Sequence, residues 1–238
     1  PLLTDVDFIT FNNEADLEKI TTRTAAILLE TIQGGAGFIQ PENNFLQKVR
    51  KRCDEVGALM IVDEIQPGFG RTGKLFGFQN YDVVPDIVVM GKGMGGGMPV
   101  GAFTSRSEYM DLLRDQPKLG HITTFGGHPV IAAACLATLQ EIVETDLMAA
   151  ALQKEKLFRS LLVHPLIKEI RGKGLMLAAM TECRDLHRRN AMLIERKLEA
   201  IRGTLQSLQS SVATSTVEVY DRLGQVARFS RGRGYQEV

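Results

Sequence analysis

Short apolar runs alternate with longer amphipathic stretches along most of the chain. Four short runs rich in aliphatic residues predict strands at 25–30, 59–63, 87–90 and 100–104, because such runs suit strands buried on both faces of a parallel sheet. Apolar residues at helical spacing predict helices at 41–56, 129–144 and 147–162. A further strand is expected at 170–180. Strands that alternate with helices predict an α/β fold with a mostly parallel sheet flanked by helices.

Two of the predicted strands lead directly into residues that can do chemistry. Asp63 ends the run 59–63, and Lys92 follows the run 87–90 after one glycine. Ligands of open α/β sheets bind beyond the carboxyl ends of the strands, where both residues would lie. An amine nucleophile beside a fixed carboxylate is the pair that pyridoxal phosphate chemistry requires. Position alone leaves open that Asp63 is only a strand-end cap and that Lys92 is an exposed loop lysine.

A nucleotide site is the alternative interpretation of the same two segments. The run that ends at Asp63 also looks like a Walker B strand, and Gly91-Lys92 looks like part of a phosphate loop. That loop needs a glycine five residues before Gly91 and a Ser or Thr after the lysine. The two positions hold Asp86 and Gly93, so the nucleotide interpretation fails. The glycines from 93 to 97 are compatible with either a binding site or a plain turn.

Four blocks, in order along the chain, carry a resemblance to a known family. They are 30–34 (ETIQG), 63–76 (DEIQPGFGRTGKLF), 91–99 (GKGMGGGMP) and 123–129 (TTFGGHP). The chain is similar to the class III aminotransferases, which are pyridoxal-phosphate enzymes of fold type I, and within them to the acetylornithine and ornithine branch. The likeness covers residues 1 to about 181. It implies that 1–181 is a truncated large domain with the start of the small domain.

The resemblance also implies a role for each matching residue. Lys92 would be the catalytic lysine that carries the cofactor, and Asp63 would pair with the pyridine nitrogen. Gln66 would neighbour the phenolic oxygen of the cofactor. Thr124 would reach the phosphate of the cofactor in the neighbouring subunit of a homodimer. Glu30 falls where the family has an active-site glutamate that serves the substrate. The implied reaction is transamination of an ornithine-like amine with a 2-oxo acid.

The chain departs from the family pattern in two ways. Gly35 stands where the ornithine branch has a second glutamate that pairs with a substrate-binding arginine, so the amino donor stays open. The family's phosphate-binding loop, its ring-stacking aromatic and a later carboxylate-binding arginine have no counterpart in this sequence. We therefore expect the chain alone to be inactive, because half of the constellation that orients substrate and cofactor is missing.

Composition excludes several other classes of function. Lys plus Arg equals Asp plus Glu, 28 each, which argues against nucleic acid or an anionic membrane as a partner. The cysteines Cys53, Cys135 and Cys183 are too far apart for a disulfide framework, and the four histidines lack ligand spacing, so we expect no metal. No apolar run is long enough for a bilayer. A cytoplasmic protein is the expectation.

The last part of the chain, 182–238, differs in character. Ile194, Leu198, Ile201 and Leu205 step by alternating fours and threes, which predicts a helix over 183–208 with a heptad seam. The segment resembles the C-terminal part of bacterial flagellar export chaperones of the hook–filament junction type, whose helix binds a helical client. A surface helix that covers its own core is the alternative. The basic stretch 228–235 is expected to be disordered.

The sequence is therefore compatible with two functions of different kinds. One is a pyridoxal-phosphate aminotransferase. The other is a non-enzymatic fusion, or chimera, whose C-terminal helix is a partner-binding module. A natural fusion, a gene-model error and an engineered junction would all produce the change near residue 182.

Overall fold

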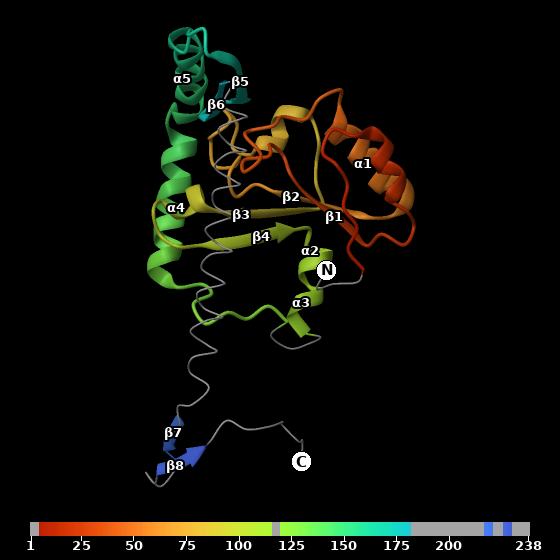
Figure 1. The fold of residues 1–238 in the computed structure, drawn as a ribbon, viewed down its shortest axis with the longest axis vertical. Coiled ribbons are helices and arrows are strands. Elements are labelled where there is room, and N and C mark those ends of the chain that lie inside the picture. The colour runs from red at the N-terminus through yellow and green to blue at the C-terminus, as the bar shows by residue number, and fades with distance from the viewer. Residues whose placement is uncertain (1–4, 116–119, 182–216, 221–225, 230–238) are drawn as a thin grey trace. The chain divides into compact units, whose positions relative to one another are not determined.

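A computed structural model of the protein describes residues 5–115, 120–181, 217–220 and 226–229 (Figure 1). The contacts within the chain divide it into two units, Pro1–Thr181 and Glu182–Val238. The helix expected over 183–208, its heptad seam and its partner lie outside the described residues. In the second unit, β7 (Val217–Tyr220) pairs antiparallel with β8 (Val226–Phe229), so the first two residues of the stretch expected to be disordered, Arg228 and Phe229, belong to a strand.

A four-stranded sheet is the centre of the first unit (Figure 1). Its strands are β1 (Ala26–Glu30), β2 (Leu59–Asp63), β3 (Ile87–Gly91) and β4 (Gly101–Ser105), in that order. The first three run parallel, and β4 pairs antiparallel with β3. This confirms the expected mostly parallel sheet. Each of these four strands lies within one residue of its predicted bounds.

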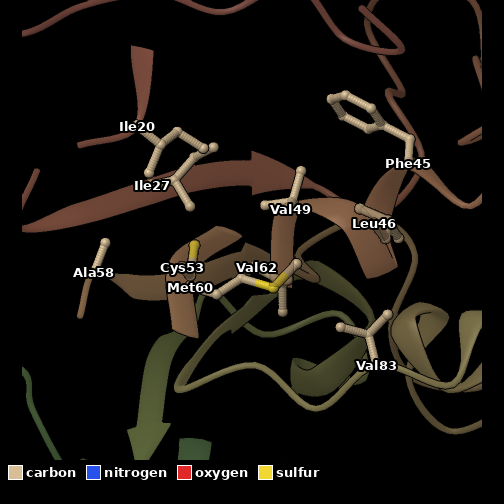
Figure 2. Packing of buried hydrophobic residues seen from close by; sticks show 10 residues of the cluster. All are labelled: Ile20, Ile27, Phe45, Leu46, Val49, Cys53, Ala58, Met60, Val62 and Val83. Atoms are coloured by element: carbon tan, nitrogen blue, oxygen red, sulfur yellow. The ribbon is translucent and has the colours of Figure 1, made fainter. Parts of the chain in front are cut away.

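One face of this sheet packs on α1 (Phe45–Val56). The core consists of apolar side chains from the helix, from the strands and from three loops: Ile20, Ile27, Phe45, Leu46, Val49, Cys53, Ala58, Met60, Val62 and Val83 (Figure 2). Burial there raises the pKa of the Cys53 thiol to about 11.

Helix α1 begins at Phe45, four residues after its predicted start at Pro41, because Asn43 and Asn44 both take positive φ. Leu28 of β1 is 66% exposed, since neighbouring residues of a strand point to opposite faces.

Two longer helices follow the sheet, α4 (Pro129–Glu144) and α5 (Leu147–Leu161). Both match the helices predicted from apolar spacing. Five shorter helices among the described residues were not predicted, because four to six residues are too few to show a period: η1 (Glu14–Lys19), η2 (Gly77–Tyr81), η3 (Lys92–Gly95), α2 (Ser107–Met110) and α3 (Leu112–Asp115). No helix in the described part of the chain is both long and apolar enough to cross a membrane.

The strand expected at 170–180 is a hairpin instead. It consists of β5 (Ile167–Lys173) and β6 (Met176–Thr181), which pair antiparallel. Gly172 and Gly174 take φ of 100° and 62°, values that side chains disfavour and that reverse the chain. The apolar pattern predicted extended structure correctly, and the turn inside it was missed.

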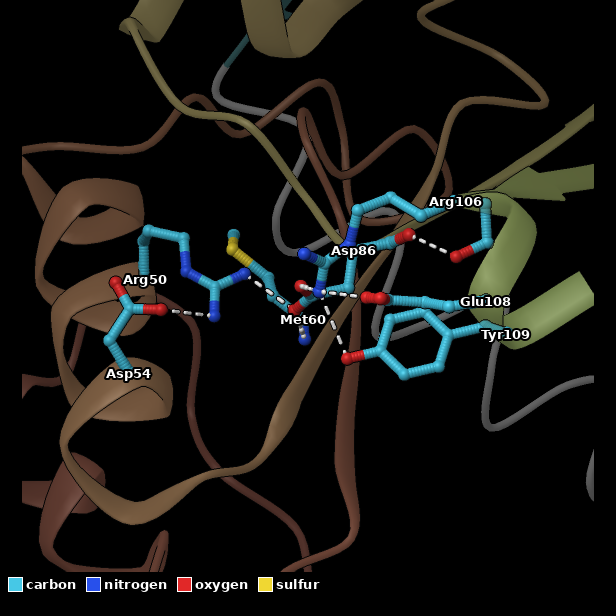
Figure 3. A network of polar contacts seen from close by, with 8 residues as sticks. Arg50, Asp54, Met60, Asp86, Arg106, Glu108 and Tyr109 are labelled. Atoms are coloured by element: carbon cyan, nitrogen blue, oxygen red, sulfur yellow. Dashed lines mark hydrogen bonds and ion pairs between the residues drawn. The ribbon is translucent and has the colours of Figure 1, made fainter.

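A polar network ties the amino-terminal edge of the sheet to its neighbours (Figure 3). Asp86, just before β3, accepts a hydrogen bond from the backbone N–H of Met60 at 2.7 Å and pairs with the Arg50 guanidinium at 2.6 Å. Arg50 also pairs with Asp54 at 2.6 Å, and Arg106 approaches Asp86 from the far side at 3.8 Å. One carboxylate therefore fixes α1, β2 and β3 against each other.

Replacing Asp86 by Asn should lower the free energy of unfolding by about 1–3 kcal/mol, because the change removes the more buried of the two carboxylates that pair with Arg50, in a place where the Arg50 and Asp86 side chains are over four-fifths buried. Urea unfolding monitored by circular dichroism measures the effect. Glu169→Gln is the control, since its ion pair with Arg171 is more exposed and should contribute less than about 1 kcal/mol. Equal losses in the two variants would contradict the assignment.

Candidate functional site

The parallel sheet brings three of the predicted site residues to one edge. Glu30 and Asp63 are opposite each other in the β1–β2 register, and Lys92 comes directly after β3. Burial and the nearby charge of Asp63 raise the pKa of the Glu30 carboxyl, against the backbone N–H of Gly34 and the charge of Lys92, which lower it. Two carboxylates and an ammonium group thus lie within electrostatic reach of each other.

Lys92 has an unusual backbone conformation. Its φ is 43°, in the left-handed region that residues with a side chain seldom adopt. Such a conformation costs about 1–3 kcal/mol and persists where the surrounding structure holds it. Lys92 begins η3, which lies against α4. Helix α4 therefore supports the short helix η3 that positions the Lys92 side chain. The strained backbone of Lys92 is consistent with a functional position.

A cavity of about 230 Å³ lies at this edge of the sheet. Its lining combines an amine, an amide and a guanidinium group with apolar side chains, from Phe38, Ile65, Gln66, Arg71, Lys92, Leu175 and Met176. Gln66 packs closely on Gly34, where a side-chain carbon would overlap the Gln66 amide oxygen. The cavity contains two of the predicted residues, Gln66 and Lys92. Sequence reasoning did not select Phe38, Arg71, Leu175 or Met176.

Asp63 caps the end of its own strand. Its Oδ1 atom accepts a hydrogen bond from the backbone N–H of Ile65 at 2.9 Å, which is the structural role that the sequence left open. The side chain is half-buried, and it faces the same edge as Glu30. A cap that uses one carboxylate oxygen is compatible with a second role for the other.

Thr124 is not brought to the cavity. It lies in an exposed turn between α3 and α4, where Gly126 N–H donates to the Thr123 carbonyl at 3.2 Å. Its predicted role, at the cofactor phosphate of a neighbouring subunit, stays a prediction. Within the described ranges, no group of three or more His, Cys, Asp or Glu residues is placed to hold a metal ion.

Glu64 is a buried carboxylate that sequence reasoning missed. It follows Asp63 directly and is fully buried. Its oxygens accept hydrogen bonds from the backbone N–H groups of Gly77 at 2.6 Å and Phe78 at 2.9 Å, and from the Thr31 hydroxyl. Burial raises the pKa of the Glu64 carboxyl. The residue joins the ends of β1 and β2 to η2, and it closes the loop that carries Gln66 and Arg71.

Known proteins that are similar to this chain are aminotransferases. The family model described as "Aminotransferase class-III" matches residues 8–203. The acetylornithine aminotransferase of Caldanaerobacter subterraneus subsp. tengcongensis is 40% identical over 191 residues, which are 78% of this chain and 48% of that protein. A LysW-aminoadipate semialdehyde/glutamate semialdehyde transaminase of Sulfolobus acidocaldarius is 40% identical over 182 residues, 74% of this chain and 46% of that protein.

A solved structure of the ornithine aminotransferase from Toxoplasma gondii, in which pyridoxal phosphate partly occupies the active site, has a TM-score of 0.69 to this chain. It is 33% identical, and the match covers 74% of this chain and 43% of that one. The chain thus spans about half the length of the relatives that it matches. The family match extends past Thr181 to residue 203. The second resemblance, of the tail to export chaperones, stays a prediction.

Glu64 should make the stability of the protein depend on pH. Its pKa in the folded protein is raised above the ordinary value of 4.5, so the folded state binds the proton more tightly. The resulting stabilisation is complete below that ordinary value and is lost as the pH rises through the folded pKa. Each tenfold difference in proton affinity corresponds to about 1.4 kcal/mol. The free energy of unfolding should therefore fall with rising pH across this window.

Urea unfolding at a series of pH values tests this. Glu64→Gln should flatten the decline and leave the part that comes from Glu30, whose pKa is also raised. Glu108→Gln is the control, because Glu108 is an exposed carboxylate that should leave the decline unchanged. An unchanged pH dependence in the Glu64→Gln variant would show that its titration does not contribute.

Proposed function

The chain belongs to the class III aminotransferases, and from that premise we propose that it carries one side of a pyridoxal-phosphate site. The proposed reaction is transamination between an ornithine-like amine and a 2-oxo acid. The observation that carries the proposal is the position of Lys92. It lies in a cavity with Gln66, directly after a parallel strand, at the edge where Asp63 and Glu30 meet.

The residues of this edge fit the ring of the cofactor. The family is pyridoxal-phosphate-dependent, and that chemistry needs an amine, a carboxylate for the pyridine nitrogen and a donor for the phenolic oxygen. Lys92, Asp63 and Gln66 supply these three groups. The absence of a side chain at Gly34 lets Gln66 lie close to the end of β1, which keeps all three at one edge.

Bound pyridoxal phosphate would supply an electron sink for the carbon that carries the amino group. Lys92, once unprotonated, would take the proton from that substrate carbon and deliver it to the cofactor. Asp63 would hold the pyridine nitrogen protonated through its negative charge. Gln66 would orient the ring by a hydrogen bond to its phenolic oxygen.

The substrate side of the site differs from the pattern of the ornithine branch. Glu30 is present and half-buried, and its Oε2 atom accepts a hydrogen bond from the backbone N–H of Gly34 at 3.2 Å. Gly35 provides no second carboxylate, and in the described structure no heavy atom lies within 4 Å of where its Cβ would be. We propose that Glu30 alone contacts the distal amine of the donor.

A second copy of the chain is the proposed partner. The family is typically homodimeric, and Thr124 would serve the phosphate of the neighbouring subunit's cofactor. Its exposure in the turn before α4 supports a role outside its own subunit. A fully buried threonine there would be unable to reach another molecule.

Lys92→Ala should abolish the covalent adduct with the cofactor. The full chain is incubated with pyridoxal 5′-phosphate, reduced with borohydride and digested, and the modified lysines are mapped by mass spectrometry. Lys74→Ala is the control, since Lys74 is exposed on the neighbouring loop and should leave the adduct at Lys92 intact. Equal modification of several exposed lysines, with no preference for Lys92, would overturn the assignment.

Asp63→Asn should weaken cofactor binding at least about tenfold, which corresponds to about 1.4 kcal/mol. Asparagine keeps the oxygen that accepts the Ile65 N–H, so the cap is retained while the charge is lost. The apparent affinity is measured by the absorbance of bound cofactor. Asp82→Asn, at an exposed position after η2, should have no effect. A loss well below tenfold at Asp63 would leave it as a cap only.

A further inference from the structure

One side of the cavity comes from a distant part of the chain. Leu175 and Met176, at the turn of the β5–β6 hairpin, line the cavity together with Lys92 and Gln66. Met176 is 1% exposed and Leu175 is 38% exposed. The apolar wall of the site therefore depends on where this turn is held, and not only on the sheet that carries the polar groups.

The turn is fitted against the loop that carries Arg71. The backbone N–H of Leu175 donates to the Arg71 carbonyl at 2.8 Å. A side-chain carbon at Gly174 would overlap the same carbonyl oxygen and lie 2.8 Å from the Thr72 Cα. Because the two backbones touch, a small displacement of the turn would move Leu175 and Arg71, which both line the cavity.

Two charged residues of α5 hold the turn in place. Glu155 accepts a hydrogen bond from the backbone N–H of Gly174 at 2.7 Å through Oε2, and it pairs with Arg159 Nε at 3.0 Å through Oε1. Arg159 donates to the carbonyls of Ile170 at 2.9 Å and Gly172 at 2.7 Å. Charge-assisted hydrogen bonds of this kind are stronger than neutral ones. The pair thus fixes the end of β5 and the first residue of the turn.

A third segment of the cavity is tied to the same turn. Gln40 donates from its side-chain amide to the Gly172 carbonyl at 3.1 Å, and Phe38, two residues earlier, lines the cavity. The Gly172 carbonyl therefore accepts from both Arg159 and Gln40. Through the turn, α5 is linked to the Phe38 segment and to the Arg71 loop.

We propose that Glu155 and Arg159 are positioning residues of the cofactor site. They hold the β5–β6 turn so that Leu175 and Met176 close the apolar side of the cavity around Lys92. Neither residue lines the cavity, so both act through the turn. The proposal rests on the proposed function, because the cavity has this use only if Lys92 carries the cofactor. A site held this way loses affinity when its supporting groups are removed.

The test uses the full chain with pyridoxal 5′-phosphate as the probe. The absorbance of bound cofactor gives the apparent affinity, and borohydride reduction with peptide mapping gives the fraction of Lys92 modified. Glu155→Gln should weaken the affinity about tenfold, or about 1.4 kcal/mol, and lower the preference for Lys92 over exposed lysines. Leu175→Ala should do the same, while Leu175→Met, which keeps the volume, should restore both.

Two controls separate positioning from general stability. Glu169→Gln removes a Glu–Arg pair from the same hairpin, between Glu169 and Arg171 at 2.7 Å, and should leave affinity and lysine preference within twofold of the unsubstituted chain. Asp86→Asn lowers stability at the opposite edge of the sheet and should also leave them unchanged. Urea unfolding of every variant gives the loss of stability for the comparison.

The possible results separate the role of the turn from the proposed function. If Glu155→Gln and Leu175→Ala bind the cofactor as well as Asp86→Asn does, the turn has only a structural role and the inference is overturned. If Glu155→Gln does not fold, Arg159→Lys decides, since it keeps the positive charge but loses the fork that reaches both the Ile170 and Gly172 carbonyls, and it should weaken the affinity in the same way. If the unsubstituted chain forms no adduct at Lys92, the proposed function fails first, and this inference falls with it.

Discussion

The parallel register of β1, β2 and β3 is the constraint on which the rest of the site depends. Parallel strands end at the same edge, so residues that are far apart in the sequence meet there without any further arrangement. Glu30 and Asp63 are paired directly in the register, and Lys92 is the next residue after β3. Hydrogen bonds between backbones thus place two carboxylates and an amine together. A slip of one residue would turn the side chains to the other face.

Buried charges fix the two ends of this sheet in different ways. At the amino-terminal edge, Asp86 pairs with Arg50 and joins α1 to the strands. At the carboxyl edge, Glu64 accepts hydrogen bonds from two backbone N–H groups and from the Thr31 hydroxyl. Burying a carboxylate without a counter-charge raises its pKa. The carboxyl edge therefore contains a buried carboxylate whose pKa burial raises.

The backbone at the same edge is also strained. Lys92 and Phe38, both in the cavity lining, take φ of 43° and 57°. Residues with side chains keep such values only when neighbouring contacts over-determine them. The contacts here come from α4 behind η3 and from the hairpin that α5 holds against the Arg71 loop. Helices that follow the sheet in the sequence therefore stabilise the conformation that the strand ends require.

The sequence by itself determined the sheet, the long helices and the residues at the strand ends. Apolar runs and helical spacing are local signals, and they placed β2 and α4 with their observed bounds. The same signals, with the family blocks, selected Glu30, Asp63, Gln66 and Lys92. Tertiary structure alone decided the burial of Glu64, the turn between β5 and β6 and the apolar wall from Leu175 and Met176. Those features depend on contacts between segments far apart in the chain, and a local pattern of hydrophobic and polar residues carries no information about which distant backbone it will meet.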